Sequence, residues 1–263
     1  MKALKAVWFF RGFILSTVKR EFQSRYSNSV LGATWTVLNP LAMIVIYTLI
    51  FSQVMRTKLP GVDGSFAYSI YLCSGLLTWG LFSEITGRAL NVFTEHSNLI
   101  KKMSFPHLCL PVIVVATALL NFIIVFGIFT IFLVVSGNFP GVAYFSIFPV
   151  MVVQITFAIG LGISLGVINV FFRDVGHFFS ICLQFWFWLT PIVYSEKILP
   201  EQARSLIELN PMTSILAAYQ NALVLGEWPD WQKLSIVALL STLLCATAVH
   251  LFRKHSGDMV DEL

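Results

Sequence analysis

The sequence predicts an all-α integral membrane protein with six transmembrane helices, an N-terminal amphipathic interfacial helix and a re-entrant helical hairpin between spans 5 and 6. Of the 263 residues, 57% are hydrophobic and only 11% are charged, whereas a soluble domain carries about a quarter charged residues. Six apolar stretches approach the roughly 20 residues that cross a bilayer, and they fall at 31–55, 66–91, 110–136, 145–171, 175–191 and 233–252. We therefore expect a single transmembrane domain, 1–263, and no soluble catalytic domain.

The first 30 residues predict a helix that lies at the membrane interface. Apolar side chains such as Trp8, Val18 and Phe22 recur at helical spacing, while the basic side chains lie mostly elsewhere on the helix. Arg11 and the Lys19–Arg20 pair interrupt the apolar run that a cleaved signal peptide needs. The segment is interpreted either as a gating helix at the cytoplasmic headgroups or as a simple membrane anchor.

Span 2 carries two charges inside an apolar stretch. Glu84 and Arg88 are four residues apart, so they share one helix face and can pair, which lowers the cost of charge within a membrane. The pair is interpreted as structural or as a link to the inner vestibule, with contact to substrate as the alternative.

The connector 92–109 predicts a short helix that docks on a partner protein. Ser97 can cap the helix and Pro106 can stop it. Apolar anchors beside lysines on a short helix suit a groove in a partner; the alternative is an ordinary surface helix. The residues expected to make this contact are Ser97, Leu99, Ile100, Lys101, Lys102 and Met103.

Span 5 and the hairpin 191–226 that follows it contain the most unusual pattern in the chain. Arg173 and Asp174 open an apolar helix, and Pro191 ends it because proline lacks an amide donor. Asn210–Pro211 then starts a short helix that ends before Gly226 and cannot cross a bilayer. Irregular backbone at membrane depth needs protein or a water-filled cavity around it, so this hairpin predicts a path through the membrane.

The distribution of basic residues predicts the orientation. Of the 17 Lys and Arg residues, twelve fall on the side of the N-terminus and five on the other side of the predicted spans. By the positive-inside rule, both termini and the connector 92–109 are cytoplasmic, and the hairpin 191–226 lies outside.

Motifs for chemistry are absent from the sequence. It contains no GxxxxGK[ST] phosphate loop, no GxSxG and no HExxH, and its four cysteines show no CxxC spacing. Nor does a chain of acidic residues follow the spans, as a proton-driven transporter often needs. We expect a permease-like subunit, not an enzyme, that binds no cofactor or metal and draws its energy from a partner.

Several segments in order resemble the membrane subunit of type-2 ABC exporters, in the branch that exports O-antigen, capsule and teichoic-acid polysaccharides across the bacterial inner membrane. The resemblance rests on LGATWTVLNPLAMIVIYTLIF, FFRDVGHFF, LQFWFWLTPIVYSEKILP and LNPMTSILAAYQNALVLG, and it runs over nearly the whole chain. Its RDV and LNP segments are fairly specific to that branch.

The resemblance implies a homodimer bound to two copies of a separate cytoplasmic ATPase, which would hold ATP and Mg. The connector would then be the coupling helix, and the N-terminal helix would gate a cytoplasmic entrance that includes Trp8, Arg11, Arg173 and Asp174. The hairpin would form a periplasmic gate that includes Pro191, Asn210, Pro211 and Tyr219. A lipid-linked polysaccharide would pass between the two subunits.

Aromatic side chains are the candidates for contact with sugar, because sugar rings stack on them through apolar C–H faces. The channel-lining candidates are Trp35, Tyr47, Phe185, Trp186, Phe187 and Trp188. Four consecutive helical residues point all round the axis, so at most one or two of the last four can face a channel. The alternative is that these rings face lipid or pack between helices.

Two other functions fit the same pattern. The first is a permease of the same family that exports drugs or lipids. The second is a membrane-embedded glycosyl- or acyltransferase, for which Glu84 and His177 are the weak candidates for an essential acid or base.

Overall fold

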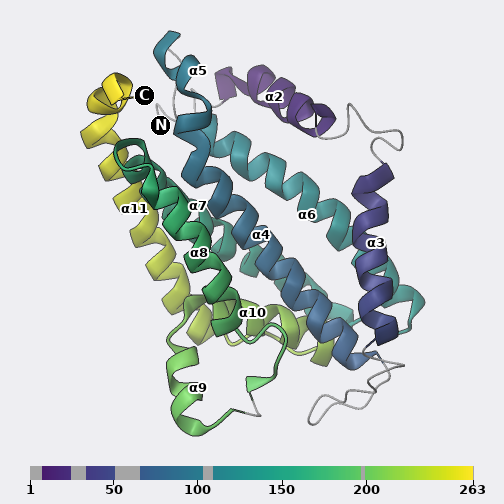
Figure 1. Cartoon of the computed structure of the whole chain (residues 1–263). Coiled ribbons are helices and arrows are strands. Elements are labelled where there is room, and N and C mark those ends of the chain that lie inside the picture. The colour runs from purple at the N-terminus through teal and green to yellow at the C-terminus, as the bar shows by residue number, and fades with distance from the viewer. Residues whose placement is uncertain (1–7, 25–33, 51–65, 103–108, 197–198, 263) are drawn as a thin grey trace.

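The computed structural model describes residues 8–24, 34–50, 66–102, 109–196 and 199–262, and within these ranges the regular structure is entirely helical (Figure 1). The elements in chain order are α2 (Arg11–Ser24), α3 (Trp35–Thr48), α4 (Ala67–Glu95), α5 (Ser97–Lys102), α6 (Cys109–Val135), the 3₁₀ helix η3 (Gly141–Ser146), α7 (Ile147–Phe171), α8 (Asp174–Leu189), α9 (Glu201–Glu208), α10 (Pro211–Gln220), the π-helical turn η5 (Asn221–Leu225) and α11 (Trp231–Glu262).

Three of the helical segments are long and apolar enough to span a membrane, which confirms the predicted class of an all-helical membrane protein. They are α6, the continuous segment Gly141–Phe171 and α11. Helix α3 is apolar but shorter over its described residues. At 1.5 Å per residue, the 27 residues of α6 reach about 40 Å, more than the roughly 30 Å of a hydrocarbon core.

Helix α4 is the centre of the bundle, and it contacts α3, α6, α7, α8 and α10 (Figure 1). Glycines of α7 bring that helix close to its neighbours. A Cβ built on Gly166 would lie 2.7 Å from the Ala89 carbonyl oxygen of α4, and one on Gly160 would lie 2.8 Å from the Cys245 amide nitrogen of α11. Glycine allows this approach because it has no side chain to hold the two helix backbones apart.

The backbone break after α8 is held by side chains from other helices. The Tyr71 hydroxyl of α4 lies 2.9 Å from the carbonyl oxygens of both Pro191 and Tyr194, and the Tyr68 hydroxyl donates to the Val193 carbonyl at 2.6 Å. These contacts replace the hydrogen bonds that the helix would have supplied, which satisfies the requirement that backbone groups within a bundle find partners.

Asn210 joins the end of α8 to the start of α10. Its side-chain oxygen accepts from the Met212 amide at 3.0 Å and from the Trp186 indole at 2.9 Å, and its amide donates to the Thr190 hydroxyl at 3.0 Å. Asn210 is the N-cap, as predicted, with Pro211 in the first turn of the helix.

The C-terminal end of α11 extends beyond the last apolar stretch predicted from the sequence, which ended at residue 252. The helix continues to Glu262. Its last turns contain an apolar stripe, in which the Phe252 ring stacks on Phe93 at 5.4 Å between centroids and Met259 is buried. Phe252 and Met259 are seven residues apart among polar residues, so the composition of this segment does not indicate that one face of the helix is apolar.

The close approach of α7 to α4 predicts that Gly166→Ala destabilises the protein. The new methyl group would press on the Ala89 backbone, and overpacking of this kind costs about 1–3 kcal/mol. The thermal midpoint in detergent, followed by tryptophan fluorescence, should fall.

Gly127→Ala on α6 is the matched control, because a Cβ there meets nothing within 4 Å. It should leave the midpoint unchanged or raise it slightly, since alanine favours helix over glycine by about 1 kcal/mol. Equal thermal midpoints for the two variants would contradict this prediction, because they would show that the α4–α7 contact accommodates the added methyl group without loss of stability.

Candidate functional site

A charged network joins α2 to the bundle. The Arg88 guanidinium of α4 contacts the Glu21 carboxylate of α2 at 3.0 Å and the Glu84 carboxylate at 3.2 Å. Helix α6 completes the network, since the Thr117 hydroxyl donates to Glu21 at 3.1 Å and the Asn121 amide donates to Glu84 at 2.7 Å. The network therefore fixes α2 against both α4 and α6.

The predicted pair of Glu84 and Arg88 is confirmed, but its three other members were missed. Their sequence separations from their partners are between 37 and 96 residues, beyond the reach of a local pattern. One signal was available for Glu21, which is the only acidic residue among positions 1–60. An isolated acid on a basic amphipathic helix indicates a basic partner elsewhere.

Among the described residues of the network, two carboxylates share one guanidinium. Both carboxylate side chains and the arginine are about a quarter exposed, so solvent screens their interaction only in part. Removal of one partner from such a group is more costly than the net gain from the pair, since the remaining charge loses its compensation.

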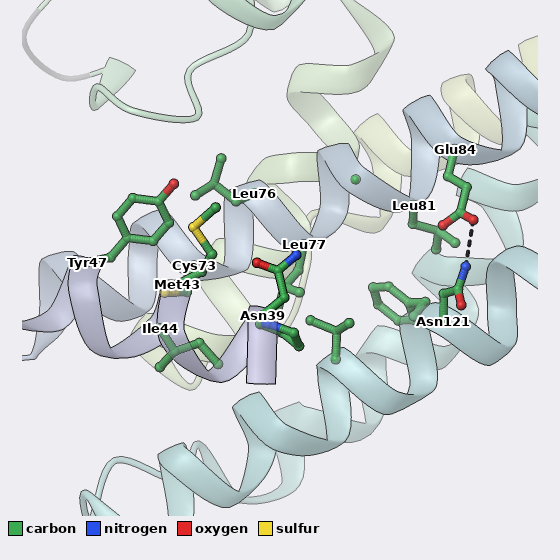
Figure 2. A pocket seen from close by; sticks show the side chains of 14 residues that line it. Asn39, Met43, Ile44, Tyr47, Cys73, Leu76, Leu77, Leu81, Glu84 and Asn121 are labelled. Carbon is green, nitrogen blue, oxygen red and sulfur yellow. Dashed lines mark hydrogen bonds between the residues drawn. The ribbon is translucent and has the colours of Figure 1, made fainter. Parts of the chain in front are cut away.

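A cavity of about 460 Å³ lies between α3, α4 and α6 and ends at this network. Figure 2 shows Glu84 and Asn121 at one end of the cavity and Tyr47 and Cys73 near the other. Apolar side chains make up most of the wall between them. The complete lining is Asn39, Pro40, Met43, Ile44, Tyr47, Cys73, Leu76, Leu77, Gly80, Leu81, Glu84, Asn121, Phe122 and Val125.

The four aromatic residues near the end of α8 divide into two pairs. Trp186 and Phe187 pack inward, where their rings contact Trp79 at 6.4 and 5.7 Å between centroids. Phe185 and Trp188 are 67% and 64% exposed. Two of the four rings are therefore exposed in this chain, and which of them faces a channel stays a prediction.

The other two aromatic candidates lie on α3. Trp35 is exposed at the start of the helix, and Tyr47 is half-buried and lines the cavity of Figure 2. The fold does not bring either residue into the group on α8.

Helix α5 forms where the coupling segment was predicted, but its apolar anchor points inward. Ile100 is 7% exposed and lines a small cleft with Phe93, Phe252 and Met259 of α4 and α11. The expectation that Ile100 is an apolar anchor exposed to a partner is therefore wrong, because the C-terminal extension of α11 covers this side chain. Lys101 is exposed, Met103 lies outside the described residues, and the side chains of Leu99 and Lys102 also lie outside the described part.

The candidate entrance residues are exposed. The Arg11 guanidinium carbon lies 4.7 Å from the centre of the Trp8 ring, a cation–π contact between the first residue of α2 and the segment that precedes the helix. Arg173 is the N-cap residue of α8, and Asp174 in its first turn complements the positive end of the helix dipole. Asn169 holds this turn, since its side-chain oxygen accepts from the Gly176 amide at 2.9 Å.

At the opposite end of the bundle, the segment predicted as a re-entrant hairpin contains the two short helices α9 and α10. Pro191 and Tyr219 are buried, and Asn210 and Pro211 are half-buried. Glu208 of α9 lies 3.7 Å from both Arg204 and Lys233. Burial raises the pKa of the nearby Glu196 carboxyl above its ordinary value, Lys233 and Arg204 lower it, and Glu208 raises it.

The described residues contain no group of three His, Cys, Asp or Glu side chains placed to hold a metal ion. The two residues considered for catalysis are also far from a catalytic arrangement. Glu84 is engaged by Arg88 and Asn121, and His177 is exposed near the start of α8.

Comparison with known proteins gives matches over most of the chain. A model of the ABC-2 type transporter family matches residues 13–224. The chain is 33% identical to the O-antigen export system permease protein RfbA of Myxococcus xanthus over 266 aligned positions, which cover 100% of both proteins. It is 29% identical over 236 positions to a protein of the same name from Klebsiella pneumoniae (89% of this chain and 88% of that one). It is 20% identical over 250 positions to the polysialic acid transport protein KpsM of Escherichia coli, with 92% of each covered.

The network predicts measurable coupling between Glu21 and Arg88. In a double-mutant cycle of Glu21→Gln and Arg88→Met, the loss of unfolding free energy in the double variant should differ from the sum of the single losses by about 1 kcal/mol. Denaturant unfolding of the purified protein in detergent measures all four states.

The exposed pair of Arg204 and Glu208 provides the control cycle, for which the coupling should stay below about 0.5 kcal/mol. Additive losses at Glu21 and Arg88 would mean that the network does not hold α2.

Proposed function

This chain belongs to the ABC-2 type transporter family, and from that membership we propose that it is the membrane-spanning permease subunit of an ATP-driven exporter of lipid-linked, O-antigen-like polysaccharide. The observation that carries the proposal is the match over 100% of both chains to a protein named as an O-antigen export permease. The relative named for polysialic acid transport supports the same class of cargo, because polysialic acid is also a polysaccharide.

The energy for export comes, in this proposal, from two copies of a separate ATPase that bind ATP and Mg on the cytoplasmic side. This chain has no phosphate-binding loop of its own. Helix α5 is the coupling contact, and its exposed Lys101 is available to a partner while Ile100 anchors the helix to α4 and α11.

We place the chain in the bacterial inner membrane with six spans and both termini in the cytoplasm. Helix α2, helix α5 and the last turns of α11 lie at the same end of the bundle (Figure 1). In the sequence, the excess of Lys and Arg falls on the same side of the predicted spans as these segments, which supports a cytoplasmic position for them. The opposite end, with α9 and α10, is then the periplasmic gate.

The cargo path is proposed to run between two copies of this chain, along the exposed face of α8. Phe178, Ile181, Phe185 and Trp188 form an exposed stripe at spacings of three or four residues. Aromatic rings on this stripe offer stacking surfaces to sugars without strong charge–charge contacts, which suits a polymer that has to move.

Deletion of the gene in its own host tests the function. We expect loss of one surface polysaccharide, with its lipid-linked form accumulating inside the cell, and recovery when the gene is restored on a plasmid. Immunodetection on intact cells and analysis of lipid-linked polymer in membrane extracts are the measurements.

The same deletion separates the alternatives. Unchanged surface polysaccharide together with new sensitivity to drugs would support an efflux permease. Loss of the polymer from the surface and also from the interior would support a glycosyl- or acyltransferase. Either result would overturn the proposal.

The exposure of Lys101 predicts that Lys101→Glu uncouples export. The substitution reverses charge on an exposed side chain and leaves the packing of Ile100 unchanged, so the protein should reach the membrane at normal levels while export falls about tenfold, a cost of about 1.4 kcal/mol. Export is measured as surface polysaccharide per cell, and binding as the ATPase recovered with the tagged chain.

Lys254→Glu on the exposed surface of α11 is the control for charge reversal at the same end of the bundle. Normal export by the Lys101 variant, or an equal defect in both variants, would contradict the assignment of α5 as the coupling contact.

A further inference from the structure

Asn169 is a buried polar residue near the end of α7, and its side chain reaches two other helices. It is 4% exposed. Its amide donates to the Leu90 carbonyl oxygen and to the Asn91 side-chain oxygen of α4, at 3.4 Å in each case. Its oxygen accepts from the Gly176 amide of α8 at 2.9 Å. One side chain therefore joins the last turns of α4 to the first turn of α8.

The bond to Gly176 caps α8 from outside the helix. The first amides of a helix have no partner within it, and the N-cap side chain normally accepts from one of them. Arg173 occupies the N-cap of α8 and makes no side-chain cap bond, because a guanidinium has no acceptor. Asn169, seven residues earlier, supplies the acceptor instead. The start of α8 is thus fixed by a residue of α7.

Packing holds this half of α8 only lightly. Helix α8 contacts α7 and α4 (Figure 1), but Phe179 is the one buried residue among its 16, all of which the structure describes. The inward-packed rings of Trp186 and Phe187 lie near the opposite end of the helix. Glycine at position 176 leaves room for the cap, since a Cβ there would lie 3.1 Å from the Asn169 oxygen. The direction of α8 at this end therefore depends on the Asn169 bond.

On α4, the partners of Asn169 lie about two turns before α5. His96 is the residue between the two helices. Its amide donates to the Val92 carbonyl of α4 at 3.3 Å, and its carbonyl accepts from the Ile100 amide of α5 at 3.1 Å. Backbone hydrogen bonds therefore continue from α4 into α5, and a displacement of α5 reaches the turns that Asn169 contacts.

Helix α7 is packed tightly against α4 at the same level. Gly166 lies less than one turn before Asn169, and a Cβ there would lie 2.7 Å from the Ala89 carbonyl oxygen. Close-packed contacts of this kind transmit a displacement because they contain no space to absorb it. The ends of α4 and α7 therefore move together, and Asn169 extends this contact to α8.

We propose that Asn169 is the positioning residue that passes a displacement of α5, through the end of α4, to the start of α8. The inference rests on the proposed function, in which α5 is the coupling contact and the exposed stripe of α8 borders the cargo path. Without this side chain, the first turns of α8 no longer follow α4. ATP hydrolysis then continues while less polymer is exported.

Two buried residues of α7 allow a matched test. Asn169→Leu removes three hydrogen bonds and keeps a side chain of similar size, while the Gly176 amide retains its 3.3 Å bond to the Arg173 carbonyl. Gln154→Leu is the control, because Gln154 is also buried and donates to the Thr78 carbonyl of α4 at 2.6 Å. That bond joins α7 to α4 and does not involve α8.

Export per ATP hydrolysed is the readout that a purely structural role would not change. The wild type and both variants are purified with the partner ATPase and reconstituted in vesicles that contain labelled lipid-linked polymer. We expect Asn169→Leu to lower the ratio of export to hydrolysis about tenfold, within the range found when a mutation changes the coupling between two sites. Gln154→Leu should keep the wild-type ratio. An unchanged ratio in Asn169→Leu, or an equal loss in both variants, would overturn the proposal.

Hydrogen exchange of the purified chain tests the cap without transport and without a variant. Gly176 and Ala203 are each the third residue of a helix whose N-cap makes no side-chain bond, and each amide donates to the carbonyl three residues earlier. They differ in the bond to Asn169. Corrected for intrinsic rates, the Gly176 amide should exchange roughly fivefold more slowly than the Ala203 amide, which is the effect of one cap. Asn169→Leu should remove the difference.

The two measurements separate failure of the inference from failure of the proposed function. If the wild type exports polymer and its Gly176 and Ala203 amides exchange equally fast, the inference alone is overturned, even when Asn169→Leu cannot be purified. If the wild type exports no polymer with any partner ATPase, the proposed function fails and the role of Asn169 in coupling fails with it.

Discussion

Polar groups inside this apolar bundle must find partners within it, and that constraint organises the structure. Arg88 is engaged by Glu21 and Glu84, and the network they form draws α2 against α4 and α6. The backbone that breaks after α8 is satisfied in the same way, by the hydroxyls of Tyr68 and Tyr71. Both the charged network and the break after α8 are stabilised by residues distant in sequence that complete their hydrogen bonds.

Features set by local spacing could be predicted from the sequence, whereas those set by contacts between helices could not. Glu84 and Arg88 pair because four residues form one helical turn, and Asn210 caps α10 because its side chain reaches an amide two residues away. The contact between Glu21 and Arg88 could not be predicted, because the two residues are 67 positions apart in the sequence and meet only in the folded bundle. Ile100 looked like an exposed anchor because the stripe on the C-terminal part of α11 that covers it is hidden among polar residues.

The two ends of the bundle are suited to different tasks. At one end, α2, α5 and the end of α11 are linked to α4 through the charged network and through the contacts of Phe93, Phe252 and Met259. At the other end, the side chain of Asn210, between α9 and α10, accepts a hydrogen bond from the Trp186 indole of α8 and donates one to the Thr190 hydroxyl. Helix α4 contacts elements at both ends, so a force applied at α5 has a continuous helical path to the opposite end.

The proposed permease depends on a separate ATPase for its energy. Purification of the tagged chain in mild detergent from its own host, with identification of the recovered proteins by mass spectrometry, tests this dependence most directly. We expect an ATPase with a phosphate-binding loop, recovered in equal amount and active in hydrolysis. Recovery of the chain alone, or with a glycosyltransferase and no ATPase, would contradict it, because this sequence contains no phosphate-binding loop of its own.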